Sequence, residues 1–240
     1  RIHNMVKYKY EHIDMLLAAS VVVQYFKQYV KELSYIRSYW TPEFADSLAM
    51  RIAKAMKDYL GVEYPVDLRK SIAKIVEISP TTRRDLAFVM RQIQELFSKE
   101  ESDAILNHLG YDRYFEEVIE YDQESLVHLL LTFNSGMTPG LRRLITDHGI
   151  NPPLIDRIHE HAGIFQFANQ KHKQLKKEWH QPPEEAHDEF QNIYKEVMLI
   201  CRIGAIFYQE EPDKRDLFIF AKVVHTINAG YTPEEGKSDV

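Results

Sequence analysis

The residues best suited to chemistry in this chain of 240 residues are two histidines and a glutamate on either side of a proline turn. His172 lies on the apolar stripe of one long predicted helix, and Glu184 and His187 lie three residues apart at the start of the next. Residues three apart share a helix face, and a turn at Pro182-Pro183 would fold the second helix back onto the first. Because imidazole and carboxylate groups suit zinc or iron, His172, Glu184 and His187 form a candidate metal site. Such a site would belong to a metal-dependent helical hydrolase or oxidase.

The same histidines also have a structural interpretation. His161 and His172 alternate with apolar residues at steps of three and four, which places both on a core-facing stripe. A di-iron carboxylate bundle needs two Glu-x-x-His pairs and two further glutamates, and Glu184-x-x-His187 is the only such pair in the sequence. The sequence therefore favours histidines packed in a helical core with no cofactor, and zinc or iron is the alternative.

Residues 141–161 have the spacing of a helix-turn-helix, in which two apolar-faced helices are joined by Gly149-Ile150. If the second helix entered a DNA groove, Arg157 would reach the bases. Two prolines, Pro152 and Pro153, occupy the start of that helix, where side chains normally read base edges. The chain is also acidic, whereas phosphate contacts require a basic surface. Nucleic acid is therefore not the expected partner, and DNA binding is kept as an alternative.

Other catalytic signatures are missing from the sequence. It contains no G-x-G phosphate loop, no G-x-S-x-G elbow and no paired C-x-x-C. Its one cysteine, Cys201, lies among apolar residues and is interpreted as a small core hydrophobe. A single cysteine excludes an internal disulfide and indicates a reducing, cytoplasmic setting. No apolar stretch reaches the roughly 18–20 residues of a membrane span, so we expect no membrane insertion.

The composition points to a helical, folded chain. It is 45% hydrophobic and 28% charged, with nine glycines, about half the average share of glycine. Collagenous, low-complexity and disulfide-stapled classes are excluded, because each needs far more Gly, Pro or Cys. Because glycine is common in turns, its scarcity indicates few turns, and a chain with few turns is expected to consist of long helices.

Charge is distributed unevenly around a net value of −6. Residues 99–124 carry nine acids against two basic residues, a net of −7, whereas residues 141–180 carry seven basic residues against four acids, a net of +3. Two solvated helical faces of opposite sign account for this distribution. The alternative is electrostatic docking of a partner or of a second copy of the chain.

Apolar spacing between the prolines predicts an all-α fold, a multi-helix array or bundle of about ten helices with a long C-terminal antiparallel helical hairpin. Thr41 and Ser98 are expected to cap helices, and Gly61 to end one. The segment 79–82 is expected to interrupt a helix at Pro80. The predicted helices cover residues 12–40, 42–60, 67–78, 83–97, 99–109, 114–121, 126–133, 141–148, 152–179, 184–208 and 217–228.

A soft boundary near residue 135 divides the chain into an N-terminal helical part, 1–134, a C-terminal hairpin part, 135–230, and a polar tail, 231–240. Gly163 and Gly204 fall inside the two long C-terminal helices, where glycine costs ~1 kcal/mol relative to alanine. Close helix approach or a ligand is expected there. Dense apolar stripes without an assembled catalytic motif favour a non-enzymatic helical interaction or scaffold protein, whose partner is another protein or a second copy.

Overall fold

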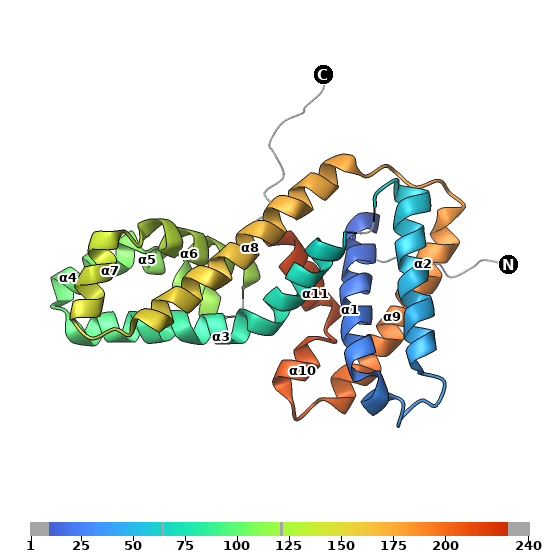
Figure 1. The fold of residues 1–240 in the computed structure, drawn as a ribbon, viewed down its shortest axis with the longest axis horizontal. Coiled ribbons are helices and arrows are strands. Elements are labelled where there is room, and N and C mark those ends of the chain that lie inside the picture. The colour runs from blue at the N-terminus through green and yellow to red at the C-terminus, as the bar shows by residue number, and fades with distance from the viewer. Residues whose placement is uncertain (1–9, 64, 121, 230–240) are drawn as a thin grey trace, which may run out of the picture.

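The computed structural model describes residues 10–63, 65–120 and 122–229. This part of the chain is all-α, as predicted, with eleven helices and no strand (Figure 1). The predicted tail, 231–240, and the predicted helix stop at Gly230 lie outside the described residues. The helices are α1 (His12–Leu33), α2 (Pro42–Leu60), α3 (Val66–Leu96), α4 (Lys99–His108), α5 (Tyr111–Ile119), α6 (Gln123–Gly136), α7 (Pro139–Asp147), α8 (Pro152–Glu178), α9 (Ala186–Phe207), α10 (Pro212–Asp216) and α11 (Phe220–Asn228).

The helices form an elongated molecule with two ends (Figure 1). One end gathers α1, α2, α9, α10 and α11, the other gathers α4 to α7, and the long helices α3 and α8 run between them. These two helices pack together antiparallel, because Asp85 of α3 pairs with Arg157 of α8 while the earlier Thr82 pairs with the later His161. Within the described ranges, no helix is both long and apolar enough to cross a bilayer.

The predicted C-terminal hairpin is not confirmed, because α8 packs chiefly on α3 whereas α9 packs on α1 and α2. The two helices meet α1 separately. His172 of α8 contacts Asp14, and His187 of α9 contacts His12. The reason is that α1 is buried on all sides from Ile13 to Val23, so several helices must cover it. The helix that follows α8 in the sequence, α9, is therefore not the helix on which α8 packs.

The predicted helix ends are confirmed where glycine or a capping side chain specifies them. The Thr41 hydroxyl accepts a hydrogen bond from the Phe44 amide at 3.2 Å, and Pro42 follows in the first turn of α2. Ser98 and Glu101 form a reciprocal capping box at α4. Gly61 ends α2 with φ 68°, a left-handed conformation that L side chains rarely adopt. Local sequence is sufficient to predict these helix ends, because a capping residue and its hydrogen-bond partner lie within one turn of each other.

The predicted break at residues 79–82 is wrong, because α3 continues through Pro80. Proline removes the amide that would donate to the Val76 carbonyl and clashes with that carbonyl, which kinks a helix rather than ending it when packing holds both halves. Ser79 and Thr82 donate hydroxyl hydrogen bonds to the carbonyls of Ile75 and Ile78. Figure 1 shows α3 changing direction along its length.

Several further boundaries differ from prediction. The first helix ends at Leu33, so Trp40 packs from the following loop. The segment from Pro212 forms the short helix α10, and α11 begins at Phe220 rather than at Leu217. Buried apolar side chains form one contiguous cluster through both ends of the molecule. Residues 134 and 135 lie in the last turn of α6, and the division into two parts at this point stays a prediction.

The two glycines inside the long helices have opposite surroundings, and this difference predicts opposite effects of alanine. A Cβ at Gly204 would lie 2.6 Å from the ring of buried Phe218, whereas a Cβ at Gly163 would meet nothing within 4 Å. Gly204→Ala should lower the free energy of unfolding by about 1–3 kcal/mol through overpacking. Gly163→Ala should raise it by up to ~1 kcal/mol. Urea unfolding of both variants measures this, and an unchanged midpoint for Gly204→Ala would contradict the close approach of α9 to Phe218.

Candidate functional site

The structure does not bring the three predicted metal ligands together. The His172 Nε2 atom lies 3.0 Å from Asp14 Oδ1, and the His172 side chain is 1% exposed. His187 Nδ1 donates to the backbone carbonyl of Glu184 at 2.9 Å, and the Glu184 carboxylate is on an exposed residue of the turn before α9. In the part of the chain that the structure describes, no three His, Cys, Asp or Glu side chains converge as a metal site would require.

The zinc or iron alternative therefore has no support from the geometry. Helix α1 explains why, since it contacts His172 through Asp14 and His187 through His12, with ring centroids 5.3 Å apart in the latter pair. The predicted metal site assumed that the turn at Pro182-Pro183 folds α9 back onto α8. Metal analysis of the purified protein, with His187→Ala for comparison, is the measurement that tests this alternative.

His172 instead belongs to a buried charged cluster at the N-terminal end of α1, the Asp14 cluster, which comprises Glu11, Asp14, His172 and Lys176. The Asp14 carboxylate accepts hydrogen bonds from His172 Nε2 and from Lys176 Nζ, the latter at 2.9 Å. Lys176 also contacts the Glu11 carboxylate. The side chains of Asp14 and Lys176 are both 6% exposed. Each buried charge thus has a partner of opposite sign, as low-dielectric surroundings require.

Hydrogen bonds keep Asp14 and Lys176 charged at neutral pH. Burial alone would raise the pKa of Asp14, but the hydrogen bonds from His172 and Lys176 outweigh burial and hold it below its ordinary value. Burial likewise opposes the charge on Lys176, and its bonds to Asp14 and Glu11 still raise the pKa of the ammonium group. Because Asp14, His172 and Lys176 are buried, we interpret the cluster as a link between α1 and α8 rather than a substrate site.

Sequence reasoning missed Asp14 and Lys176, although a signal for each was present. Asp14 is a lone carboxylate at the start of the most apolar stretch of the chain, and a charge in such a place needs a buried partner. Lys176 follows His172 by four residues, so both side chains lie on one face of α8. The partners could not be paired from sequence, because 158 residues separate Asp14 from His172.

Two arginines of the helix-turn-helix-like segment, Arg142 and Arg157, pair with acidic side chains of the protein itself. The Arg157 guanidinium donates two hydrogen bonds to Asp85, at 2.6 and 2.8 Å, and the Asp85 side chain is 0% exposed. Arg142 pairs with Asp156 at 2.7 Å. Arg157, the side chain expected to reach bases, therefore binds α8 to α3, and these contacts do not support the DNA-binding alternative.

Two predicted core residues lie where the sequence placed them. His161 is buried, and its Nδ1 lies 2.7 Å from the Thr82 hydroxyl, which donates to Ile78, so the imidazole donates to Thr82. Cys201 is buried and unpaired by disulfide, and burial raises the pKa of its thiol to about 12. A thiol with so high a pKa carries almost no thiolate at neutral pH, so it is not a nucleophile.

No family model matches this chain, and neither a curated protein nor a solved structure is significantly similar to it. The function is therefore inferred from the arrangement of its side chains. One exposed feature of the protein is a hollowed, largely apolar surface at the end formed by α1, α2 and α9.

A groove of about 390 Å³ lies where the α1–α2 loop meets α9. Aromatic and aliphatic side chains form its floor, and the ion pair between Arg51 and Glu196, at 2.8 Å, forms its polar edge. Arg37 stacks over the rings of Tyr39 and Trp40, 4.5 and 5.5 Å from their centroids. The lining residues are Tyr39, Trp40, Phe44, Arg51, Glu196 and Leu199.

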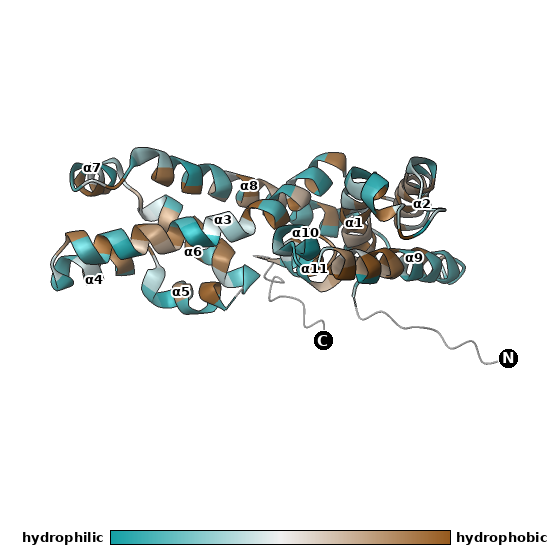
Figure 2. Cartoon of the chain, turned by 90° about the horizontal axis from the view of Figure 1, so that it is seen from below, coloured by the Kyte–Doolittle hydropathy of each residue, from teal (hydrophilic) through white to brown (hydrophobic). Residues whose placement is uncertain are grey.

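Exposed apolar side chains continue from this groove. In the loop, Tyr35 is 91% exposed and Ile36 is also exposed. Along α9, Leu199, Ile203 and Ile206 recur at steps of four and three and so share one stripe, on which Leu199 and Ile203 are half-buried and Ile206 is 72% exposed. Figure 2 shows strongly hydrophobic turns along α9. We call these residues together, Tyr35, Ile36, Tyr39, Phe44, Leu199, Ile203 and Ile206, the α9 end surface.

The Asp14 cluster predicts a stability effect with a defined pH dependence. Asp14→Asn leaves Lys176 and His172 without their buried anion, and the free energy of unfolding at pH 7 should fall by about 3 kcal/mol. Since the folded pKa of Asp14 lies below its ordinary value of 3.8, the stabilisation is present above pH 4 and is lost as the pH falls through the folded pKa. The gap between wild type and variant should therefore narrow in acid.

Urea unfolding between pH 3 and 7 measures this gap. Asp46→Asn is the matched control, because Asp46 pairs with Lys27 on the surface, where its side chain is 54% exposed, and such pairs contribute about 0–1 kcal/mol. Equal losses for the two variants would show that burial of the Asp14 cluster contributes nothing.

Proposed function

We propose that this chain is a non-enzymatic helical scaffold protein that associates with a second copy of itself through the α9 end surface. The observation that supports it is the cluster of exposed apolar side chains, Tyr35 and Ile206 foremost, beside an open aromatic-lined groove. Single exposed apolar residues are ordinary, but a contiguous apolar area rimmed by polar residues is typical of protein interfaces.

The shape of the surface favours a second copy as the occupant. A two-fold symmetric interface must be self-complementary, with a projection and a recess on the same patch. Here Tyr35 projects from the α1–α2 loop, and the groove next to it is lined by Tyr39 and Leu199. In a symmetric pair, each groove would receive an apolar side chain of the other copy. Tyrosine is also among the residues that contribute most to binding energy in interface centres.

The charge distribution is compatible with this pairing. The strongly acidic segment 99–124 lies in α4, α5 and the start of α6, at the opposite end of the molecule from α2 and α9 (Figure 1). Joining two copies through α9 therefore keeps their acidic ends far apart, beyond a Debye length in physiological salt. Within the groove, Arg51 already pairs with Glu189 and Glu196. The resulting dimer would present two distant, acidic α4–α7 ends, which suits a scaffold.

Sedimentation velocity over protein concentrations from about 1 to 100 µM tests the proposal, since a moderate interface has a micromolar Kd. We expect a concentration-dependent shift from monomer to dimer. Ile206→Glu should abolish it by burying an unpaired charge, and Tyr35→Ser should weaken it. The matched control is Ile119→Glu, which adds the same charge at an exposed residue, 59% exposed, on α5.

A protein that stays monomeric throughout this range would overturn self-association and leave the surface to a different protein. A dimer that forms equally well with Ile206→Glu would show that the interface lies elsewhere.

A further inference from the structure

The two long helices that join the ends of the molecule each contain a residue that weakens a helix, and these two residues lie at the same level. Thr82 of α3 contacts His161 of α8 at 2.7 Å, and the two helices run antiparallel. Two residues further toward the α1 end lie Pro80 on α3 and Gly163 on α8. Because each residue advances about 1.5 Å along a helix axis, Pro80 and Gly163 share one cross-section of the molecule.

In α3, the residues around Pro80 reduce the resistance of the helix to bending. Pro80 supplies no amide to the Val76 carbonyl. The hydroxyls of Ser79 and Thr82 donate to the carbonyls four residues earlier, at 2.6 and 2.9 Å, and such bonds from serine and threonine often bend helices. Figure 1 shows α3 changing direction along its length. The bend in α3 therefore has a local cause in the sequence.

In α8, Gly163 is not required by close packing. It lies on the exposed side of the helix, and a Cβ there would meet nothing within 4 Å. Gly204 differs, because a Cβ there would lie 2.6 Å from the Phe218 ring. Glycine in a helix interior costs ~1 kcal/mol relative to alanine, since its backbone has more freedom to lose. Gly163 thus makes α8 easier to bend at the level of Pro80.

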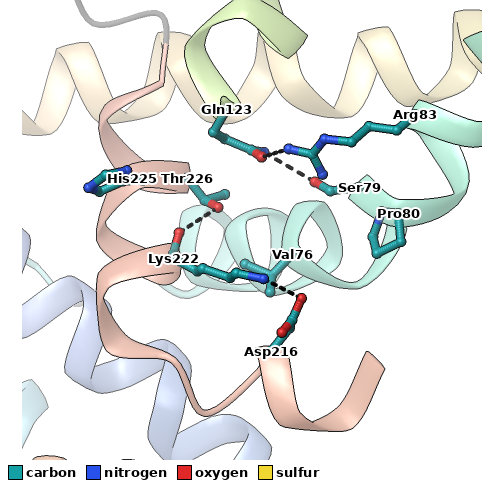
Figure 3. A pocket seen from close by; sticks show the side chains of 9 residues that line it. All are labelled: Val76, Ser79, Pro80, Arg83, Gln123, Asp216, Lys222, His225 and Thr226. Atoms are coloured by element: carbon teal, nitrogen blue, oxygen red, sulfur yellow. Dashed lines mark hydrogen bonds and ion pairs between the residues drawn. The ribbon is translucent and has the colours of Figure 1, made fainter. Parts of the chain in front are cut away.

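Hollows adjoin Pro80 on two neighbouring faces of α3. One, of about 70 Å³, lies between α3, α6, α10 and α11 and is lined by Pro80 and Gln123 (Figure 3). Another, of about 360 Å³, lies between α1, α3 and α10 and is lined by Pro80, Tyr29 and Lys214. Close-packed interiors resist movement. These hollows provide the space that a change in the angle of the α3 bend requires.

Polar contacts hold the helices together on each side of this level. On the side of α4 to α7, Arg157 of α8 donates two hydrogen bonds to Asp85 of α3. On the side of α1, the Asp14 cluster links α8 to α1, and the Tyr25 hydroxyl of α1 donates to the Ala73 carbonyl of α3. Each end of the molecule thus holds its own half of α3 and of α8, and the weakened level lies between these halves.

We propose that the two ends of the protein move relative to each other by bending at Pro80 of α3 and Gly163 of α8. A few residues that absorb a change in backbone angles between two packed bodies form a hinge. The motion changes the distance between the α9 end surface and the acidic α4–α7 end. This hinge is a property of a single chain and shares no residue with the α9 end surface, so it does not depend on the proposed self-association.

Single-molecule fluorescence energy transfer across the hinge tests the proposal. Dyes are attached through Lys54→Cys on α2 and Asp103→Cys on α4, which replace exposed residues at the two ends. Cys201 is buried and does not compete for the dyes. Subnanomolar protein keeps each chain monomeric, because a moderate interface has a micromolar Kd. We expect a distribution of transfer efficiency wider than shot noise, with exchange in microseconds to milliseconds.

Three variants assign this width to the hinge. Gly163→Ala stiffens α8 and should reduce the excess width to about half or less, and Pro80→Ala, which restores the missing amide of α3, should also reduce it. Gly140→Ala is the matched control, because Gly140 lies in the first turn of α7 and a Cβ there would meet only Thr138 Oγ1, at 4.0 Å. It should leave the width unchanged.

Circular dichroism checks the folding of each variant, and Gly163→Ala decides the matter if Pro80→Ala does not fold. A distribution for the unsubstituted protein that is no wider than shot noise, or equal widths in Gly163→Ala and Gly140→Ala, would overturn the hinge.

Discussion

Every residue of α1 from Ile13 to Val23 is buried, so this part of the helix has no face toward water. A helix that is apolar all round must be covered all round, and α2, α3, α9 and α11 pack against it. The one charge in this stretch, Asp14, must then find partners inside the protein. His172 and Lys176 of α8 supply them, which determines where the far end of α8 lies. The predicted pairing of α8 with α9 is not confirmed, because α1 contacts each of these helices separately.

A second set of polar contacts extends the fold away from this core. Asp85 and Thr82 of α3 bind Arg157 and His161 of α8 one turn apart, so the two longest helices are held in an antiparallel register. Removal of Arg157 would leave the fully buried Asp85 carboxylate without this partner, which is unfavourable in a low-dielectric interior. The register of α3 against α8 is therefore specified by pairs of polar side chains as well as by apolar packing. These two helices carry the small helices α4 to α7 at a distance from α1 and give the molecule its length (Figure 1).

Three side chains that the sequence assigns to the core, to a metal site or to DNA binding are thus used for structure. His161, His172 and Arg157 each bind a side chain on a neighbouring helix. Two hollows on the described part of the protein differ in chemistry and lie in different places. The α9 end surface is apolar and hollowed, as a protein interface is. The cavity where α3, α6, α10 and α11 meet is lined by polar side chains (Figure 3).

The sequence by itself determined the helical class, most helix ends and the core stripes. Thr41, Gly61 and Ser98 could be assigned because capping involves residues within one turn of each other. The buried seam of α9 through Val197, Cys201 and Gly204 could be assigned because helical periodicity is local. Only the tertiary structure decided which helices pair, whether Pro80 ends or kinks α3, and which residue meets His172. Those outcomes depend on contacts between residues tens to more than a hundred positions apart, and many pairings of amphipathic helices satisfy the same local pattern.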